Sequence, residues 1–306
     1  MPSSNDSQSP RAKPFIKWVG GKGQLLGQLG QLLPSDLSSR KQFDYREPFV
    51  GGGAMLFFML CNFPNLRSAT INDLNKNLVT AYTAVRDSPE ELISLLSEQQ
   101  SKYRECPSEV DRKEFYLSER ARYNAQGLSS VETAALFIFL NRTCFNGLHR
   151  VNSRGLFNVP FGRSTNPLIC DEETIRADSA LLQKVEILNG DFEATAIGVS
   201  PETFFYFDPP YRPLTQTSSF TAYATDGFDD KEQKRLADFC RQLNANGHQW
   251  LLSNSDPHNS NPNDNFFEEA FDGFDINRVS ASRMINSKAD GRGKISELAI
   301  RNYRKC

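Results

Sequence analysis

An aromatic run that ends in two prolines, FFYFDPPY at residues 204–211, allows few folds. Its first four residues are apolar and β-prone, which predicts a buried strand. The two prolines lack the backbone N–H that a sheet ladder needs, so the strand must end at Asp208. Open α/β sheets bind ligands at the carboxyl ends of their strands. Asp208 and Tyr211 therefore offer a carboxylate and a ring to a flat, amine-bearing ligand. The alternative is a strand-ending turn that Asp208 merely caps.

Charge distribution says more than total charge. The chain has 306 residues, 39% of them hydrophobic, which is enough to form the core of one large domain or of two smaller ones. Its formal net charge is -2, so the total charge does not indicate binding to nucleic acid. Local basic patches can nevertheless hold an anionic polymer, unless they are simply two solvated faces. One stretch, from Thr133 to Cys170, has no acidic residue and contains Arg142, Arg150, Arg154 and Arg163. In a second stretch Asp290 is the one acidic residue among the basic residues Arg278, Arg283, Lys288, Arg292 and Lys294.

Six scattered cysteines form no CxxC pair, so neither a disulfide framework nor a zinc site is predicted, and we expect no metal. The polar start, MPSSNDSQSP, has no apolar signal core, and no apolar run reaches the length of a membrane span. These features predict a cytoplasmic protein with reduced thiols, no membrane partner and a disordered tail over residues 1–12.

The segment KPFIKWVGGKGQLL places Lys17, Trp18 and Lys22 beside paired glycines. It is not a P-loop, because Ile16 stands where the first glycine belongs and Gly23 stands where Ser or Thr is required. The paired glycines instead let the backbone approach something closely, next to a ring and an ammonium group. Alternatively, Trp18 is an ordinary core residue.

The segment DYREPFVGGGAMLFFML predicts a short strand, a turn at Gly51 to Gly53 and a helix from Ala54. That order is typical of cofactor binding in a Rossmann-like sheet. Leu56 replaces the third glycine of GxGxxG, which disfavours a pyrophosphate. Asp73 ends a second predicted strand, where an acid can accept hydrogen bonds from ribose hydroxyls. It could also cap a helix near Leu74. Together these features indicate a nucleoside cofactor.

Residues 87–184 read as an insertion into the α/β pattern. Two helices are predicted there, one opened by a capping box at Ser88 and Glu91 and one by a capping box at Ser129 and Glu132. Residues 141–163 then alternate apolar and polar side chains around a turn at residues 153–155, which predicts a basic β-hairpin.

The base of this hairpin carries Asn146, Leu148 and Arg150. Such a ribbon could enter a major groove, with the arginine forked on guanine and the leucine against a thymine methyl group. A decorated surface without base reading is the alternative.

The α/β pattern then resumes with strands in VEILNGDFE, HQWLLSNSD and ELAIRNY, and with a helix between Asp229 and Gly247. We therefore predict an α/β, Rossmann-like domain from residues 13–86 and 185–306.

The motifs KWVGGK, EPFVGGGA, INDLN, FNGLHRVN, FNVPFG, GDF, FYFDPPY and LLSNS occur in one order. With them the chain resembles the Dam family of DNA adenine-N6 methyltransferases, which methylate adenine in GATC, from about Phe15 to Tyr303. The resemblance implies S-adenosylmethionine as cofactor, S-adenosylhomocysteine as product, no metal, double-stranded DNA as partner and a monomer. It also implies that residues 87–184 form a target-recognition domain of helices and a β-hairpin.

The resemblance implies three groups of site residues. The catalytic group is Asp208, Pro209, Pro210 and Tyr211. The cofactor-binding group is Trp18, Lys22, Phe49, Gly51, Gly53, Asp73, Phe192 and Asp208. The DNA-binding group is Lys17, Phe145, Asn146, Leu148, Arg150 and Pro160. Phe145 is a departure, since some relatives carry a tyrosine there; it keeps a ring face but loses a hydroxyl.

The chemistry expected from these residues requires a flipped base, because an adenine stacked inside a duplex is out of reach. Tyr211 would stack on the base, while Asp208 and the Pro209 carbonyl accept the two amine hydrogens. Alternatives are a methyltransferase acting on RNA or on a protein glutamine amide, and a DNA-binding module that has lost catalysis. The sequence leaves open the exact recognition site and any partner endonuclease of a restriction-modification pair.

Overall fold

The computed structural model describes residues 12–125, 127–213, 228–282 and 294–304. Among them the chain divides into two compact units. The first unit takes the residues up to Gly21, Gly51–Asn62 and Asn75–Asn189; the second takes Lys22–Val50, Phe63–Leu74 and those from Gly190 on. The predicted tail over residues 1–12 lies outside the described residues except at its last position.

Seven strands form one mixed sheet in the order β3-β2-β1-β4-β5-β7-β6, which confirms the α/β prediction. Strands β2, β1, β4 and β5 run parallel, whereas β7 is antiparallel to both β5 and β6. Strand β6 was not predicted from the sequence. The strands are β1 (Phe43–Glu47), β2 (Leu66–Asp73), β3 (Val185–Asn189), β4 (Thr203–Phe207), β5 (Gln249–Ser255), β6 (Asp275–Ser282) and β7 (Lys294–Arg301).

The functional end of the sheet follows from its strand order. Strands β1 and β4 are neighbours, but the chain leaves β1 for β2 on one side and β4 for β5 on the other. Connections that diverge in this way open a crevice beyond the carboxyl ends of the two strands, where α/β sheets bind ligands. Residues that directly follow Glu47 and Phe207 are therefore placed to line a site.

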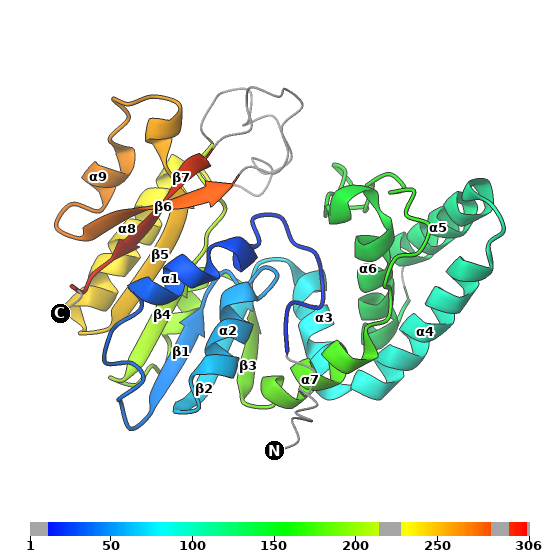
Figure 1. Ribbon diagram of the computed structural model, residues 1–306, viewed down its shortest axis with the longest axis horizontal. Helices are drawn as coiled ribbons and strands as arrows, with labels where there is room; N and C mark the ends of the chain where they lie inside the picture. The colour runs from blue at the N-terminus through cyan, green and yellow to red at the C-terminus, as the bar shows by residue number, and fades with distance from the viewer. Residues whose placement is uncertain (1–11, 126, 214–227, 283–293, 305–306) are drawn as a thin grey trace, which may run out of the picture. The chain divides into compact units, whose positions relative to one another are not determined.

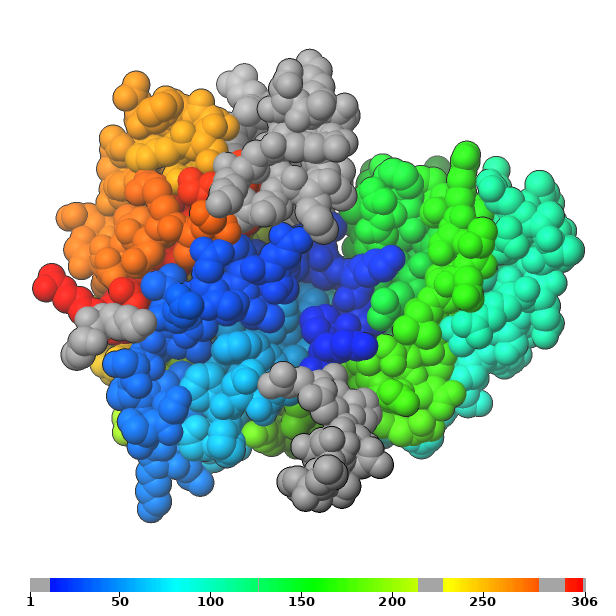
Figure 2. All heavy atoms as spheres, viewed as in Figure 1, coloured from blue at the N-terminus to red at the C-terminus, as the bar shows by residue number. Residues whose placement is uncertain are grey.

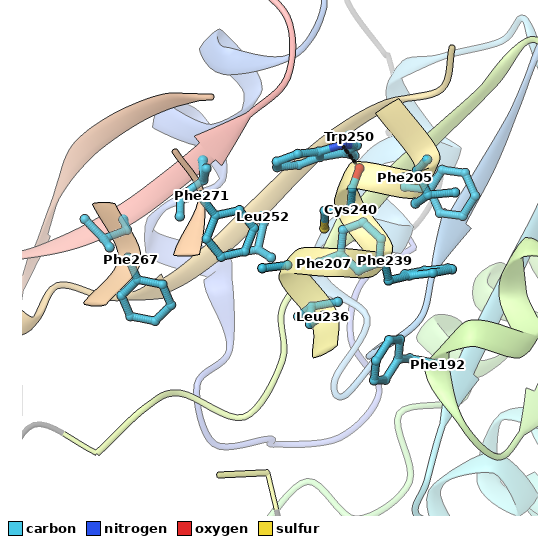
Figure 3. Close-up of a cluster of buried hydrophobic side chains, with 14 residues drawn as sticks. Phe192, Phe205, Phe207, Leu236, Phe239, Cys240, Trp250, Leu252, Phe267 and Phe271 are labelled. Atoms are coloured by element: carbon cyan, nitrogen blue, oxygen red, sulfur yellow. Dashed lines mark hydrogen bonds between the residues drawn. The ribbon is translucent and has the colours of Figure 1, made fainter. Parts of the chain in front are cut away.

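Every residue of β4 is buried, as the aromatic run predicted. Phe205 and Phe207 lie on the face covered by α8 (Asp230–Ala245), where they pack with Phe239 and Trp250 (Figures 1 and 3). The Trp250 indole N–H, which would otherwise be an unpaired buried donor, bonds to the Cys240 carbonyl at 3.0 Å. This core anchors the strand whose end carries Asp208.

The second unit also holds short helical segments. They are η1 (Lys22–Gln24), α1 (Leu26–Leu32), η3 (Phe192–Ala196), η6 (Pro257–Asn259) and α9 (Phe266–Ala270). Helix α8 starts at the predicted Asp229 cap, whose side chain accepts two backbone N–H bonds, and Gly247 follows it with a positive φ.

In the first unit, α6 is the central helix and packs against α3, α4 and α5 (Figure 1). Residues 134–140 of α6 are buried on all sides, which explains why its sequence is apolar throughout. The helical elements of this unit are α2 (Ala54–Asn62), α3 (Lys76–Asp87), α4 (Pro89–Glu105), α5 (Glu109–Asn124), α6 (Ser130–Thr143), η2 (Phe145–Gly147) and α7 (Glu172–Leu182).

The predicted helix caps had mixed outcomes. The capping box of Ser129 and Glu132 forms as expected. The box predicted at Ser88 and Glu91 is wrong, because the Ser88 side chain makes no capping bond. The alternative reading of Asp73 as a cap is also wrong, since the side chain of Asn75 accepts the first backbone N–H groups of α3.

The predicted hairpin over residues 141–163 doubles back on itself, but it does not form regular strands. Two isolated antiparallel bridges hold it, Cys144 to Phe161 and Val151 to Phe157. The turn expected at residues 153–155 closes with a bond from the Gly155 N–H to the Asn152 carbonyl. Part of the segment, drawn in green, is visible at the surface of the first unit in Figure 2. We call residues 144–162 the recognition segment.

The described helices include none long and apolar enough to cross a membrane. The five described cysteines are free thiols.

Candidate active site

The Asp208 corner is held from two sides. From α8, the Gln233 side chain donates to the Pro210 carbonyl at 2.9 Å. From the end of β5, Asn254 accepts the Arg212 N–H at 3.1 Å, and Ser255 donates to the Arg212 carbonyl at 2.8 Å. These bonds satisfy backbone groups that the strand can no longer pair, so the corner is rigid. Sequence reasoning quoted LLSNS as a motif but gave these side chains no role, and it missed Gln233.

Lys22 pairs with Asp208 in the centre of the site. Its Nζ atom lies 2.9 Å from Asp208 Oδ1, and the lysine side chain is only 5% exposed. The same ammonium group lies 4.4 Å from the centroid of the Tyr211 ring. Burial raises the pKa of the Asp208 carboxyl, and the adjacent Lys22 opposes that rise. The structure thus brings together three predicted site residues from segments far apart in the sequence.

Tyr211 has a second partner that the sequence did not indicate. Its hydroxyl donates to Glu297 Oε2 on β7 at 2.6 Å. Burial, with neighbouring carboxylates, raises the pKa of Tyr211 well above its usual range. The phenol therefore stays protonated and serves as a donor.

Phe49 and Phe192 form an aromatic wall in the second unit. Their ring centroids are 5.4 Å apart, and the Arg235 guanidinium lies 4.1 Å from the Phe192 ring. Phe192 is buried within the core, whereas Phe49 is half-buried. Asp73 ends β2 as predicted and is half-exposed.

The loops that carry this wall are tied together by Asn72. Its side-chain amide donates to the Pro48 carbonyl at 3.0 Å and to the Gly190 carbonyl at 2.9 Å. The Asn72 carbonyl also accepts the Val50 N–H. Asn72 lies in the INDLN motif, but sequence reasoning assigned it no function.

The glycine turn lies against Trp18 in the first unit. Gly51 has a positive φ of 48°, and a Cβ atom there would lie 2.9 Å from Trp18 Cδ1. A Cβ atom on Gly53, with φ of 76°, would collide with the Tyr82 hydroxyl, which donates to the Gly51 carbonyl at 3.1 Å. The close approaches that these glycines permit are therefore to Trp18 and Tyr82.

Trp18 also stacks on His149 of the recognition segment, with ring centroids 5.8 Å apart. Asn141 links the same two parts of the chain: it accepts the Lys17 N–H at 2.8 Å and donates to the carbonyls of Lys17 and Gly147. The candidate DNA-binding Lys17 is thereby anchored to the base of the recognition segment.

The other candidate DNA-binding residues lie on the recognition segment. Phe145 is 50% exposed, and its N–H bonds to the carbonyl of Pro160, which is also exposed. Asn146 is exposed in a left-handed conformation, with φ of 55°. Arg150 is exposed and donates to Asn158 Oδ1 at 2.7 Å, while Leu148 is half-buried.

The two basic stretches are less available than their sequence suggested. Arg142 donates to the Phe15 carbonyl from a half-buried position, and Arg163 faces Glu109 at 3.6 Å. In the second stretch, Arg278 is paired with both Asp256 and Glu268. Four residues of that stretch lie outside the described residues: Arg283, Lys288, Asp290 and Arg292.

A cavity of about 140 Å³ lies elsewhere, between α4, α5 and α6 of the first unit, and none of the candidate site residues lines it. The described residues include no cluster of three or more His, Cys, Asp or Glu side chains that could hold a metal ion.

Comparison with known proteins gives consistent relatives. Residues 18–285 match the family described as D12 class N6 adenine-specific DNA methyltransferase. The chain is 45% identical to the type II methyltransferase M.MjaIII of Methanocaldococcus jannaschii, over 95% of this chain and 99% of that protein. It is 31% identical to the DNA adenine methylase of Haemophilus influenzae, over 95% of each chain. A solved rRNA methyltransferase, aviRa of Streptomyces viridochromogenes, aligns with a TM-score of 0.40 and 14% identity over 98% of this chain and 94% of that one, which is too weak to carry an argument.

Proposed function

The chain belongs to the D12 class of N6 adenine-specific DNA methyltransferases, and we propose that it methylates an adenine held at the Asp208 corner, with S-adenosylmethionine as donor. The observation that carries this proposal is the joining of Lys22, Asp208 and Tyr211 beyond the carboxyl ends of β1 and β4. The proposal is supported by the general rule that α/β sheets bind ligands beyond the carboxyl ends of such strands, where Asp208 offers a carboxylate and Tyr211 an aromatic ring.

The adenine amine is a poor nucleophile because its lone pair is delocalised into the ring. In our proposal the Asp208 carboxylate and the Pro209 carbonyl accept its two hydrogens, which localises the lone pair on nitrogen. Tyr211 stacks on the base, which must leave the duplex to reach this corner. Fixed acceptors act without reorganisation, so positioning and electrostatics supply most of the acceleration. The raised pKa of Asp208 also suits a carboxyl that takes up the proton lost from the methylated amine.

The residues present fit a cationic nucleoside cofactor. Asp73, half-exposed at the end of β2, is suited to the ribose hydroxyls, and the wall of Phe49 and Phe192 is suited to an adenine ring. When bound, S-adenosylmethionine supplies an electrophilic methyl group on a sulfonium, and its carbon–sulfur bond breaks as the carbon–nitrogen bond forms. S-adenosylhomocysteine is then the second product. The remaining residues proposed to contact the cofactor are Trp18, Lys22, Gly51 and Gly53.

We propose that the recognition segment reads the target sequence in double-stranded DNA.

 The segment contains no acidic residue, and Phe145, Asn146, Arg150 and Pro160 are exposed on it. An exposed arginine can fork to guanine, and an apolar side chain can meet a thymine methyl group. Because the chain resembles the Dam family, we propose GATC as the site. We also propose that residues 87–184 form the target-recognition domain, with residues 13–86 and 185–306 as the catalytic domain. That the protein is a monomer, and that it lies in the cytoplasm, both stay predictions.

The experiment that tests this function measures methyl transfer from labelled S-adenosylmethionine to two duplexes, one with GATC and one with those bases scrambled. We expect label only in the GATC duplex, recovered as N6-methyladenine after digestion to nucleosides. Equal labelling of both duplexes would remove the GATC assignment while leaving the chemistry. Label in RNA or protein but not in DNA would contradict the proposal.

A further inference from the structure

Glu297 reaches the Tyr211 hydroxyl because of the register between two antiparallel strands. Strand β7 pairs with β5 so that Glu297 stands opposite Ser255. The Ser255 hydroxyl bonds to the Arg212 carbonyl, and the Glu297 carboxylate accepts the Tyr211 hydroxyl at 2.6 Å. The cross-strand pair of Ser255 and Glu297 thus holds Arg212 and Tyr211, the two residues that follow the double proline. A register slip of one residue would turn Glu297 to the other face of the sheet.

The hydrogen bond between the Tyr211 hydroxyl and the Glu297 carboxylate is of a strong kind. A hydroxyl that donates to a carboxylate makes a short, charge-assisted hydrogen bond. The backbone on either side of Tyr211 is already fixed by Gln233, Asn254 and Ser255, so the remaining freedom of the tyrosine lies in its two side-chain torsions. Anchoring the hydroxyl, at the far end of the ring, restricts the first torsion directly. The hydroxyl oxygen lies on the axis of the second torsion, which is restricted because a phenol O–H prefers the plane of its ring and here must point at the Glu297 carboxylate.

We propose that Glu297 is a positioning residue for methyl transfer: its carboxylate fixes the Tyr211 ring in the plane against which the target base stacks. This inference rests on the proposed function of Tyr211. Glu297 acts through the tyrosine and does not itself meet the reacting atoms.

The test compares Glu297→Ala, which removes the acceptor, with Glu297→Gln, which keeps an acceptor oxygen of similar reach. Glu269→Ala, which removes an exposed carboxylate from α9 of the same unit, controls for the change in charge. Tyr211→Phe removes the hydroxyl and keeps the ring. The readouts are the single-turnover rate, S-adenosylmethionine affinity, thermal unfolding, and the fluorescence of 2-aminopurine in place of the target adenine.

We expect Glu297→Ala to slow methyl transfer about tenfold, which corresponds to about 1.4 kcal/mol, with unchanged cofactor affinity. Its 2-aminopurine fluorescence should rise, because the flipped base loses its stacking partner. Glu297→Gln and Glu269→Ala should stay near the wild-type rate. In the Tyr211→Phe background, Glu297→Ala should cause no further loss, since the bond is already absent.

Two results would overturn the inference while leaving the proposed function intact. One is a Glu297→Ala enzyme with wild-type rate and fluorescence; the other is an equal further loss in the Tyr211→Phe background, which would indicate a general structural role. A wild-type protein that neither transfers methyl groups to DNA nor changes 2-aminopurine fluorescence would overturn the proposed function, and this inference with it.

Discussion

Lys22 and Asp208 form a close ion pair, with 2.9 Å between Nζ and Oδ1 and a lysine side chain that is almost wholly buried. A buried charge needs such a partner, because an unpaired one is costly. The pair joins the glycine-rich segment near the start of the chain to the strand end at residue 208. It also sets the electrostatics of the site, since Lys22 stabilises the ionised form of Asp208.

Replacement of Lys22 by methionine should therefore change the pH dependence of methyl transfer. Burial raises the pKa of Asp208 and Lys22 opposes the rise, so the variant should have a higher pKa than the wild type. Activity that needs the ionised carboxylate is lost as pH falls through that pKa. The acid limb of the pH–rate profile, scaled to its own plateau, should move to higher pH. Lys231→Met, which changes an exposed lysine, is the control. If the acid limb of the Lys22→Met variant stays at the wild-type pH, the role of Lys22 in lowering the pKa of Asp208 is contradicted.

Asp178 gives a pH effect on stability in the first unit. Its side chain is fully buried, Oδ1 accepts the Lys13 N–H at 3.0 Å, and Oδ2 has no hydrogen-bond partner among the described residues. Burial raises the pKa of Asp178 to about 8. A raised pKa in the folded state means that the favourable contribution is present at low pH and is lost as pH rises toward 8.

Asp178→Asn, which resembles the protonated acid at every pH, should match the wild type near pH 4 and exceed its stability at pH 9 by on the order of 5 kcal/mol. Urea unfolding at both pH values measures this difference. The exposed Asp238→Asn serves as the control. A difference that does not depend on pH would contradict the buried, protonated state of Asp178.

Substitution of Gly53 is predicted to be costly for two reasons: its backbone has a positive φ, and a side chain there would collide with Tyr82. Gly53 and Gly155 both have positive φ, 76° and 74°, but a Cβ atom on Gly155 would meet nothing within 4 Å, whereas one on Gly53 would strike the Tyr82 hydroxyl. Gly155→Ala should cost about 1 kcal/mol, and Gly53→Ala about 2–4 kcal/mol. Urea unfolding compares them. Because Tyr82→Phe removes the obstructing hydroxyl, it should recover part of the Gly53→Ala loss; no recovery would point to another cause.

Arg150 is predicted to read one guanine. It is exposed on the recognition segment and bonded to Asn158, so its guanidinium is already oriented. Arg150→Ala should reduce discrimination at one base pair by about 1–3 kcal/mol, measured as relative kcat/KM on duplexes with single substitutions in the site. Arg154→Ala, in the adjacent turn, should weaken binding to all duplexes alike. An Arg150→Ala enzyme with the wild-type order of preference would remove the base-reading role.

The sequence predicted the features that depend on local chemistry. The double proline ends β4 directly before Asp208, as predicted. The Ser129 and Glu132 pair formed its capping box because the interacting groups are three residues apart. Local chemistry was insufficient where neighbours compete. Ser88 looked equally suited to a capping box, yet its side chain does not cap α4.

Contacts between distant segments could not be predicted. Glu297 reaches Tyr211 only through the register of β7 with β5, and Gln233 reaches Pro210 only through the packing of α8. Strand β6 was missed because the apolar residues of its sequence, DINRVSAS, do not alternate regularly with polar ones. Its pairing with β7 supplies the stability. Residues that hold the site were therefore harder to find than residues that form it.

The most direct test of the account is the yield of N6-methyladenine in a GATC duplex after incubation with S-adenosylmethionine, for the wild type, Asp208→Ala and the exposed control Asp272→Ala. The account predicts a loss of about a thousandfold for Asp208→Ala, because the lost group acts in the transition state, and a wild-type yield for Asp272→Ala. Thermal unfolding and cofactor affinity verify that the Asp208 variant is folded. A folded Asp208→Ala enzyme with near-normal turnover would contradict the central claim.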